Sequence, residues 1–388
     1  MPQDLVPGIR KFVISESVIG DGAIAIAGHS ARNLMAKRAL LVTDPGILAT
    51  EHVGRVCEQL ELEGIAVTLF SGVSPNPRDH EVMAGVALGH DVGCDIIIVV
   101  GGGSPIDCAK GISIVLANGG HILDYEGVDK ISRAGPPLIC LPTTAGTSAD
   151  VSQFAIITDT LRKVKVSIIS KLVVPDLAII DPRITVSMPP YLTACTGVDV
   201  MTHAFEALVS TAHWHLTDLL AIDAIRLVNS HLDTAVRQPE NIDARTGMTL
   251  ASMEAGYAFS NVSLGAVHAM AHSLGGMLDL PHGECNALLL EHVVRYNYAT
   301  CGERYDRASA ALGIDLRGLD ASARRDRLVS ALSALRTSVG VRGSLAERGV
   351  TPQHFRALAE LAHRDPCILT NPRKASVADL EAIYGDAL

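Results

Sequence analysis

Three histidines lie close together in the segment AVHAMAHSLGGMLDLPHGE at 266–284. His268 and His272 are four residues apart, which places them on one face of a helix. The glycine pair at 275–276 is expected to end that helix, so that His282 returns after a turn. A single histidine on an apolar face is usually an ordinary core residue, but three together need a common cause. Because neutral imidazole is the commonest metal-ligating side chain, the segment predicts a metal site.

A carboxylate and a fourth imidazole come from the segment GVDVMTHAFEALVS, in which Asp199 and His203 are also four residues apart. An isolated Asp–His pair on a helix is more often a surface or capping pair, but here it accompanies the downstream histidines. Two helices and one turn can bring one carboxylate and three imidazoles to one point, which exceeds the three protein ligands of many catalytic zinc sites. This set suits Fe(II) or Zn(II), and the spacing does not say whether His268 or His272 is the ligand.

A glycine cluster occurs where a strand is expected to turn into a helix, in VVGGGSPIDCAKGIS at 99–113. Glycines let the backbone approach a ligand closely, and the first turn of a helix offers free N–H groups to a phosphate. An ordinary tight turn is the alternative. The cluster is neither a GxGxxG fingerprint, because Ile106 stands at the last glycine position, nor a P-loop. Three consecutive glycines followed by Ser104 favour phosphate binding.

Two further features suit a dinucleotide. The loop PTTAGTSAD at 142–150 follows another expected strand, and its hydroxyls can hold ribose, phosphate or a carboxamide. Asp44 ends the first expected strand, where an acid can accept a hydrogen bond from an adenosine ribose and repel a 2′-phosphate. Capping of the following helix is an equally good explanation for Asp44, so both roles stay open.

The elements that must position these residues differ between the two halves of the chain. The first half alternates apolar, β-branched strands with helical patterns, which indicates a parallel sheet covered by helices, with a hairpin near Thr160 added to it. After the SMPP segment, strand signals nearly vanish and helical periodicity dominates. We therefore predict two domains: a Rossmann-like α/β domain at 1–186 and an all-α, metal-binding domain at 187–388.

Bulk properties narrow the class of protein. A chain of 388 residues usually needs two cores, and 48% hydrophobic with 19% charged residues suits a globular protein. A net charge of −10 argues against broad nucleic-acid binding. The opening residues lack a signal-peptide pattern, and the longest apolar runs are too short to span a membrane, so a cytoplasmic protein is expected. None of the eight cysteines forms a CxxC pair, so no zinc ribbon or redox motif is indicated.

Four segments together resemble the iron-containing alcohol dehydrogenase family, and within it the branch of 1,3-propanediol, methanol and other primary-alcohol dehydrogenases. These segments are GGGSPIDCAKGI, PTTAGTSADVSQFAIITD, GVDVMTHAFEALVS and HAMAHSLGGMLDLPHGECNALLLEHVVRYN. The resemblance extends from about residue 10 to the closing DPCILTNPRKASVADLEAIY segment. It implies a nucleotide-binding α/β domain, a helical metal domain and an active site in the cleft between them.

The resemblance also implies roles for individual residues. His272 would lie beside the nicotinamide and substrate. The metal ligands would be Asp199, His203, His268 and His282. The pyrophosphate would lie on Gly102, Gly103 and Ser104, and the rest of the cofactor along Thr143, Thr144, Thr147, Asn76 and Lys165. The substrate pocket would be shaped by Phe154, Phe259, Leu264 and Cys367.

The sequence therefore predicts a metal-dependent alcohol dehydrogenase that interconverts a small primary alcohol or diol and its aldehyde. NAD is expected rather than NADP, together with one divalent metal, Fe(II) before Zn(II), and a homo-oligomer is expected from the resemblance. His272 or a ribose hydroxyl would relay the proton. The alternatives are a glycerol-dehydrogenase-like or dehydroquinate-synthase-like relative, a non-redox metal lyase or hydrolase, and a non-catalytic nucleotide-binding regulator. The full ligand set counts against the glycerol-dehydrogenase-like or dehydroquinate-synthase-like relative. The glycine cluster counts against the lyase or hydrolase.

Overall fold

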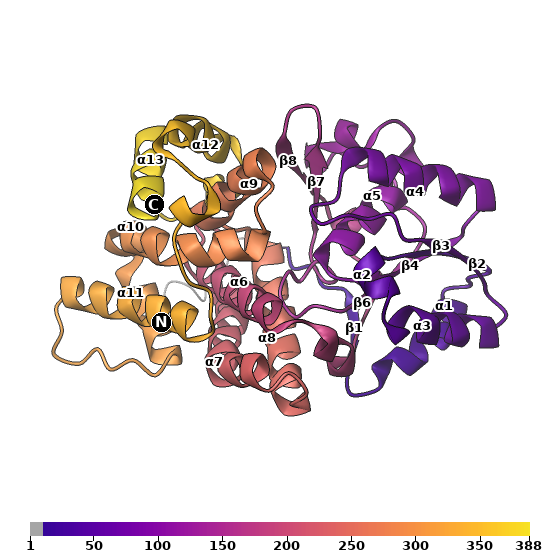
Figure 1. The fold of residues 1–388 in the computed structure, drawn as a ribbon, viewed down its shortest axis with the longest axis horizontal. Helices are drawn as coiled ribbons and strands as arrows, with labels where there is room; N and C mark the ends of the chain where they lie inside the picture. The colour runs from indigo at the N-terminus through magenta and orange to yellow at the C-terminus, as the bar shows by residue number, and fades with distance from the viewer. Residues whose placement is uncertain (1–10) are drawn as a thin grey trace. The chain divides into compact units, whose positions relative to one another are not determined.

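The computed structural model describes residues 11–388, which form two compact units. The α/β unit comprises Val13–Thr144 and Ser148–Met188. The helical unit comprises Pro189–Leu388 together with Lys11, Phe12 and the short loop Ala145–Thr147. A parallel-sheet N-terminal half and a helical C-terminal half confirm the predicted fold class (Figure 1).

The α/β unit is built on a six-stranded parallel sheet with the strand order β1-β9-β6-β4-β2-β3. Its central strand β4 is apolar and buried along its whole length, as a strand covered on both faces must be. The strands are β1 (Glu16–Ile19), β2 (Arg38–Val42), β3 (Ala66–Phe70), β4 (Ile96–Gly101), β6 (Leu138–Pro142) and β9 (Leu177–Ile180).

Helices cover both faces of this sheet (Figure 1). Alternate residues of β4 belong to different cores, since Ile97 packs in the same core as Val82 and Ile112, whereas Ile98 packs in the same core as Val56. Period-two alternation of a strand explains this division. The helices are α1 (Ala27–Asn33), α2 (Pro45–Leu48), α3 (Glu51–Leu62), α4 (Asp79–Val92) and α5 (Gly103–Asn118).

The expected hairpin is present as β7 (Phe154–Asp159) and β8 (Val164–Ile169), which pair antiparallel. It does not extend the main sheet, however. β8 pairs on its other side with β5 (Gly127–Val128), so the hairpin belongs to a separate three-stranded sheet. The expectation that the hairpin is added to the parallel sheet was therefore wrong. The edge of β8 pairs instead with β5, a two-residue strand that gave little sequence signal.

The helical unit surrounds α6 (Pro190–Val209), which is buried almost continuously from Thr193 onwards and begins with a proline in its first turn. Its other helices are α7 (His215–Arg237), α8 (Ile242–Val262), α9 (Ala266–Leu278), α10 (His282–Ala311), α11 (Ala321–Ser338), α12 (Pro352–Arg364), α13 (Val377–Asp386) and the 3-10 helices η6 (Ala346–Arg348) and η7 (Pro366–Thr370). Within the described part of the chain, no helix combines the length and apolarity needed to cross a membrane.

The sequence had suggested that the glycine pair ends α9, and this expectation was wrong. The helix continues through Gly275 and Gly276 and ends at Leu278, where Asp279 adopts a left-handed backbone with φ 54°. Burial of the helix outweighs the weak helix propensity of glycine. Pro281 then caps the next helix, and His282 is the first residue of α10 rather than part of a free turn.

Candidate active site

The central helix α6 supplies two polar groups to the interior of the helical unit. Asp199 and His203 are 1% and 3% exposed, and His203 Nε2 lies 3.9 Å from Asp199 Oδ1. The four-residue spacing places both on one face of the helix. A carboxylate this deeply buried is costly unless a cation or hydrogen bonds compensate its charge.

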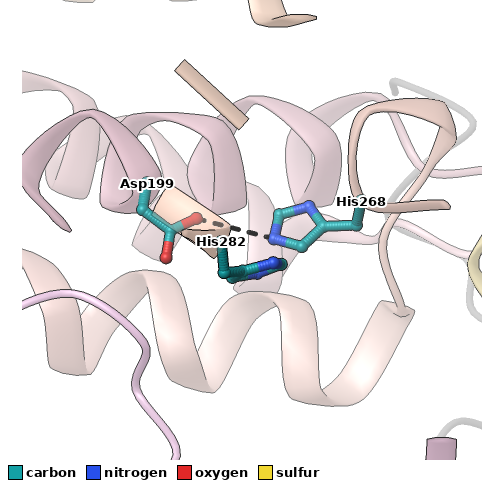
Figure 2. A group of neighbouring side chains, drawn as sticks. All are labelled: Asp199, His268 and His282. Carbon is teal, nitrogen blue, oxygen red and sulfur yellow. Dashed lines mark ion pairs between the residues drawn. The ribbon is translucent and has the colours of Figure 1, made fainter. Parts of the chain in front are cut away.

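The other two histidines reach the same region from α9 and α10 (Figure 2). His268 Nε2 lies 3.7 Å from Asp199 Oδ1, and its ring stacks on His203 with the centroids 4.6 Å apart. Ligand atoms of Asp199, His268 and His282 all lie within 4.8 Å of one another. The structure therefore brings Asp199, His268 and His282 together, with His203 in contact with Asp199, and these are the four residues that the family resemblance implies as ligands.

The lone-pair-bearing oxygen and nitrogen atoms of this group are arranged as a cation requires. Burial lowers the pKa of His203 and of His268 well below the usual value, so both imidazoles are neutral and carry a lone pair. The side-chain nitrogen of Asn286 lies 2.6 Å from Asp199 Oδ1 and 3.1 Å from the Nε2 atoms of His268 and His282. Three acceptor atoms thus converge on one point. The residues present fit a divalent metal ion.

A carboxylate behind His268 fixes its orientation. Glu206 Oε2 lies 2.6 Å from His268 Nδ1, and Glu206 Oε1 accepts the backbone N–H of Val267 at 2.7 Å. Burial raises the pKa of Glu206 to about 7. A carboxylate bonded to Nδ1 leaves Nε2 as the ligand atom. Sequence reasoning missed Glu206, although its position seven residues after Asp199 on α6 places it on the same face.

His272 has a different surrounding. Its Nδ1 lies 2.8 Å from Asp365 Oδ2, and Asp365 caps the 3-10 helix η7. Its ring stacks on that of His282 with the centroids 5.3 Å apart, but it is not part of the group formed by Asp199, His268 and His282. The structure thus separates His268 from His272, which the spacing could not do. Sequence reasoning also missed Asp365, which lies 93 residues away along the chain.

Three of the four expected pocket residues line this part of the helical unit. Phe259 stacks on His203 with the centroids 4.4 Å apart. The backbone N–H of Cys367 donates to Asp365 Oδ1, and the carbonyl of Leu264 accepts from Thr370. The fourth, Phe154, belongs to the α/β unit, where it begins β7 and its carbonyl accepts from the buried Lys110 ammonium at 2.6 Å. All four side chains are buried.

The glycine cluster forms the turn between β4 and α5, with Gly102 at the N-cap and Gly103 as the first helical residue. A Cβ at Gly102 would lie 3.1 Å from Thr144 Cγ2, so the backbone here is closely packed. Thr143 follows β6, and its buried hydroxyl has no hydrogen-bond partner among the described residues. A free hydroxyl beside open N–H groups of a helix fits a phosphate or ribose.

Other expected cofactor residues meet at one edge of the α/β unit. The backbone N–H of Asn76, which has a left-handed φ of 56°, donates to Ser104 Oγ at 3.3 Å. The Thr158 hydroxyl donates to the Asn76 carbonyl, and Thr158 stands opposite Lys165 in the hairpin. Thr147 is the exception, because its loop packs with the helical unit.

Asp44 follows β2 and caps α2, with Oδ1 accepting the N–H of Ile47 at 2.9 Å. The capping role that the sequence left open is therefore present. β2 pairs with β4 so that Val42 lies beside Val99, which brings the following Asp44 level with the start of the glycine cluster. Capping through one carboxylate oxygen is compatible with a second role for the other.

Comparison with known proteins gives matches along nearly the whole chain. Residues 15–182 match the family description "Iron-containing alcohol dehydrogenase", and residues 193–388 match "Fe-containing alcohol dehydrogenase family, C-terminal". The chain is 39% identical to 1,3-propanediol dehydrogenase of Klebsiella pneumoniae over 99% of this chain and 98% of that one. It is 38% identical to NAD-dependent methanol dehydrogenase of Bacillus methanolicus over 97% and 99%. Among solved structures, a 1,3-propanediol oxidoreductase superposes with a TM-score of 0.95 at 38% identity, over 98% of this chain and all of that chain.

Proposed function

Because the chain belongs to the iron-containing alcohol dehydrogenase family, we propose that it interconverts a small primary alcohol or diol and its aldehyde, with NAD as the hydride carrier. The chain is an oxidoreductase. The observation that carries the proposal is the buried cluster of one carboxylate and neutral imidazoles, since a group of this kind has no evident structural purpose without a metal.

The proposed ligands are Asp199, His203, His268 and His282. One carboxylate and three imidazoles suit Fe(II), with Zn(II) as the alternative. The bonds that fix His268 from behind support this assignment, because metal-bound histidines usually donate their other N–H to a carboxylate.

The proposed NAD site lies at the carboxyl ends of the parallel strands. Gly102, Gly103 and Ser104 would receive the pyrophosphate on the N–H groups of the first turn of α5. The carboxylate of Asp44 would accept from the adenosine ribose and repel a 2′-phosphate, so NAD would be preferred over NADP. The remaining contacts would come from Asn76, Thr143, Thr144, Thr147 and Lys165. In this proposal residues 1–186 bind the dinucleotide and residues 187–388 bind the metal.

When bound, the metal polarises the hydroxyl or carbonyl oxygen of the substrate, and the nicotinamide accepts or returns the hydride. The chain's own part is to orient the reactants, to exclude water and to move a proton. His272 would take the hydroxyl proton during alcohol oxidation and return it during aldehyde reduction. The buried side chains of Phe154, Phe259, Leu264 and Cys367 would select small, apolar substrates.

We also propose a cytoplasmic homo-oligomer that acts on small molecules and has no nucleic-acid or membrane partner. The net charge of −10 supports the first of these exclusions.

The experiment is a panel of alcohols and aldehydes, assayed with NAD and NADP after reconstitution of the protein with Fe(II) or Zn(II). Ethanol, methanol and 1,3-propanediol should produce reduced nicotinamide, with NAD as the better cofactor. Glycerol is the control for a polyol enzyme of the same fold, and its clear preference would replace the primary alcohol as the substrate class. Absence of nicotinamide reduction with every alcohol, with either metal, would refute the proposed activity.

A further inference from the structure

We propose that Asp365 is a positioning residue for proton transfer: it holds His272 with Nδ1 protonated and Nε2 as the nitrogen that exchanges a proton with the substrate. The inference rests on the proposed function, because it specifies how His272 performs the role given to it there. No motif around Asp365 suggested this role, since the residue precedes a short 3-10 helix far along the chain.

The first support is the geometry of the pair. Asp365 Oδ2 lies 2.8 Å from His272 Nδ1, and the side chains are only 7% and 6% exposed. Burial alone would raise the pKa of Asp365, but His272 and the hydrogen bonds around the carboxylate lower it below its usual value. An ionised carboxylate accepts hydrogen bonds and cannot donate them. The ring must therefore carry a proton on Nδ1, and in the neutral ring the lone pair is then on Nε2.

The second support is that the other carboxylate oxygen of Asp365 is also hydrogen bonded. Oδ1 accepts the backbone N–H of Cys367 at 2.8 Å, as the capping bond of η7. The carboxylate is thus anchored to the backbone on one side and holds the imidazole on the other. A side chain fixed in this way restricts both the rotation and the tautomer of His272.

The third support is the contrast with the neighbouring histidine on α9. His268 is bonded through Nδ1 to Glu206, and its Nε2 lies 3.1 Å from Asn286 within the ligand group. Among the described residues, Asp365 is the hydrogen-bond partner of the His272 ring, and Nε2 takes no such bond. Glu206 therefore orients His268 as a metal ligand, whereas Asp365 orients His272 as the proton-exchanging group.

A second metal site is the competing explanation, because His272, Asp365 and Cys367 offer ligand atoms within 4.8 Å of one another. One observation counts against it. Both carboxylate oxygens of Asp365 are already hydrogen bonded. The metal stoichiometry of the wild type and of an Asp365 variant separates the two explanations.

The decisive variant is Asp365→Asn. Asparagine is as good a helix N-cap as aspartate, so its carbonyl oxygen should keep the bond from the Cys367 N–H and preserve η7. The amide NH₂ must then face His272 and donate to Nδ1. The ring is forced into the opposite tautomer, with its proton on Nε2, where it can no longer accept one from the alcohol.

We expect Asp365→Asn to lower kcat about 10²-fold or more, as loss of general acid–base catalysis does, with little change in KM, bound metal or NAD affinity. In a double-mutant cycle, adding Asp365→Asn to His272→Ala should cause little further loss, because the group on which Asp365 acts is already gone. A merely structural role would lower the activity of both backgrounds equally.

The matched control is Asp218→Asn. Asp218 Oδ1 lies 3.0 Å from His213 Nδ1, so this change alters a similar buried pair elsewhere in the helical unit. It should leave kcat near the wild-type value. The tautomer can be read directly from ¹⁵N NMR spectra of histidine-labelled protein loaded with diamagnetic Zn(II), with His272→Ala used to assign the signal.

The outcomes distinguish the inference from the proposed function. Wild-type protein should show His272 protonated at Nδ1, and Asp365→Asn should move the proton to Nε2. If the wild type oxidises alcohols but Asp365→Asn retains its kcat or its tautomer, the inference is wrong and the proposed function stands. Two bound metals per chain, one of them lost in Asp365→Asn, would also overturn it in favour of a second metal site. If no alcohol is oxidised by the wild type, the proposed function fails, and the tautomer spectra still test whether Asp365 positions the ring.

Discussion

His268 and His272 stand one helical turn apart on α9, and each is bonded through Nδ1 to a different carboxylate. His268 contacts Glu206 at 2.6 Å, and His272 contacts Asp365 at 2.8 Å. Of these two histidines, only His268 belongs to the group of close ligand atoms formed with Asp199 and His282. The hydrogen bonds behind the two rings therefore distinguish residues that the sequence presents as equivalent.

Replacing each of these histidines by alanine should have different consequences for metal binding. His268→Ala removes a proposed ligand, so bound metal should fall sharply and turnover should cease. His272→Ala should retain near wild-type metal and bind NAD, yet lose about 10²–10⁴-fold in kcat. Metal analysis of the purified variants, alongside steady-state kinetics, makes the comparison. Equal loss of metal in both variants would mean that the ligand set is different.

Glu206→Gln should weaken metal binding without removing a ligand. The side-chain carbonyl would keep the Val267 N–H, so the amide would donate to His268 Nδ1 and force the proton onto Nε2. Changes of this kind behind a ligand typically cost about 10–100-fold in metal affinity. Competition with a chelator measures the effect. Glu254→Gln, which alters a carboxylate on α8, is the control and should leave metal affinity unchanged.

Asp44→Ser should relax the preference for NAD. Serine still caps α2, so the fold is kept while the negative charge is removed. A like charge near a 2′-phosphate costs roughly 1–4 kcal/mol, so the ratio of kcat/KM for NADP to that for NAD should rise about tenfold or more. Asp44→Gly should behave similarly. The ribose role is ruled out if the wild type already prefers NADP or if both variants keep the wild-type ratio.

Glu254 should make stability depend on pH. Burial raises its pKa to about 7, with a smaller contribution from Asp223, and its Oε2 has no hydrogen-bond partner among the described residues. The folded protein thus holds this proton more tightly than the unfolded chain. The resulting stability is present below the ordinary pKa of 4.5 and is lost as the pH rises through about 7.

Glu254→Gln mimics the protonated form, so the variant should be more stable than the wild type above about pH 7 and similar to it below about pH 4.5. Thermal unfolding followed across this range makes the comparison. A constant difference in Tm at every pH would show that Glu254 does not titrate in the window given.

Local sequence patterns were enough to predict the parallel sheet and the candidate metal-binding histidines and aspartate, whereas the choice of His268 over His272 came from the family resemblance. Strand β4 is a continuous apolar run that ends in glycine, and this pattern is typical of a strand buried on both faces. The ligands are recognisable because His268 and Asp199 each have a histidine four residues further along the same helix. In both cases the pattern that makes the prediction possible lies within a few consecutive residues of one strand or helix.

The groups behind the ligands were not predictable, because each contact joins distant parts of the sequence. Glu206 and His268 are 62 residues apart, and His272 and Asp365 are 93 residues apart. Asn286 lies near His282 on α10, but nothing in its type or spacing indicates that its amide meets three ligand side chains. The end of α9 was misplaced for a related reason: tertiary burial, which is not local, holds Gly275 in the helix.

Metal-dependent turnover shows whether Asp199 and the three histidines hold a metal that the reaction needs. The protein would be stripped of metal, and NAD-dependent oxidation of 1,3-propanediol would be followed as Fe(II) is added back in known amounts. We expect the metal-free protein to be inactive, its activity to rise in proportion to bound Fe(II) up to one ion per chain, and His268→Ala to gain nothing from the same titration. Full activity in the metal-free protein, or full metal-dependent activity in His268→Ala, would contradict this expectation.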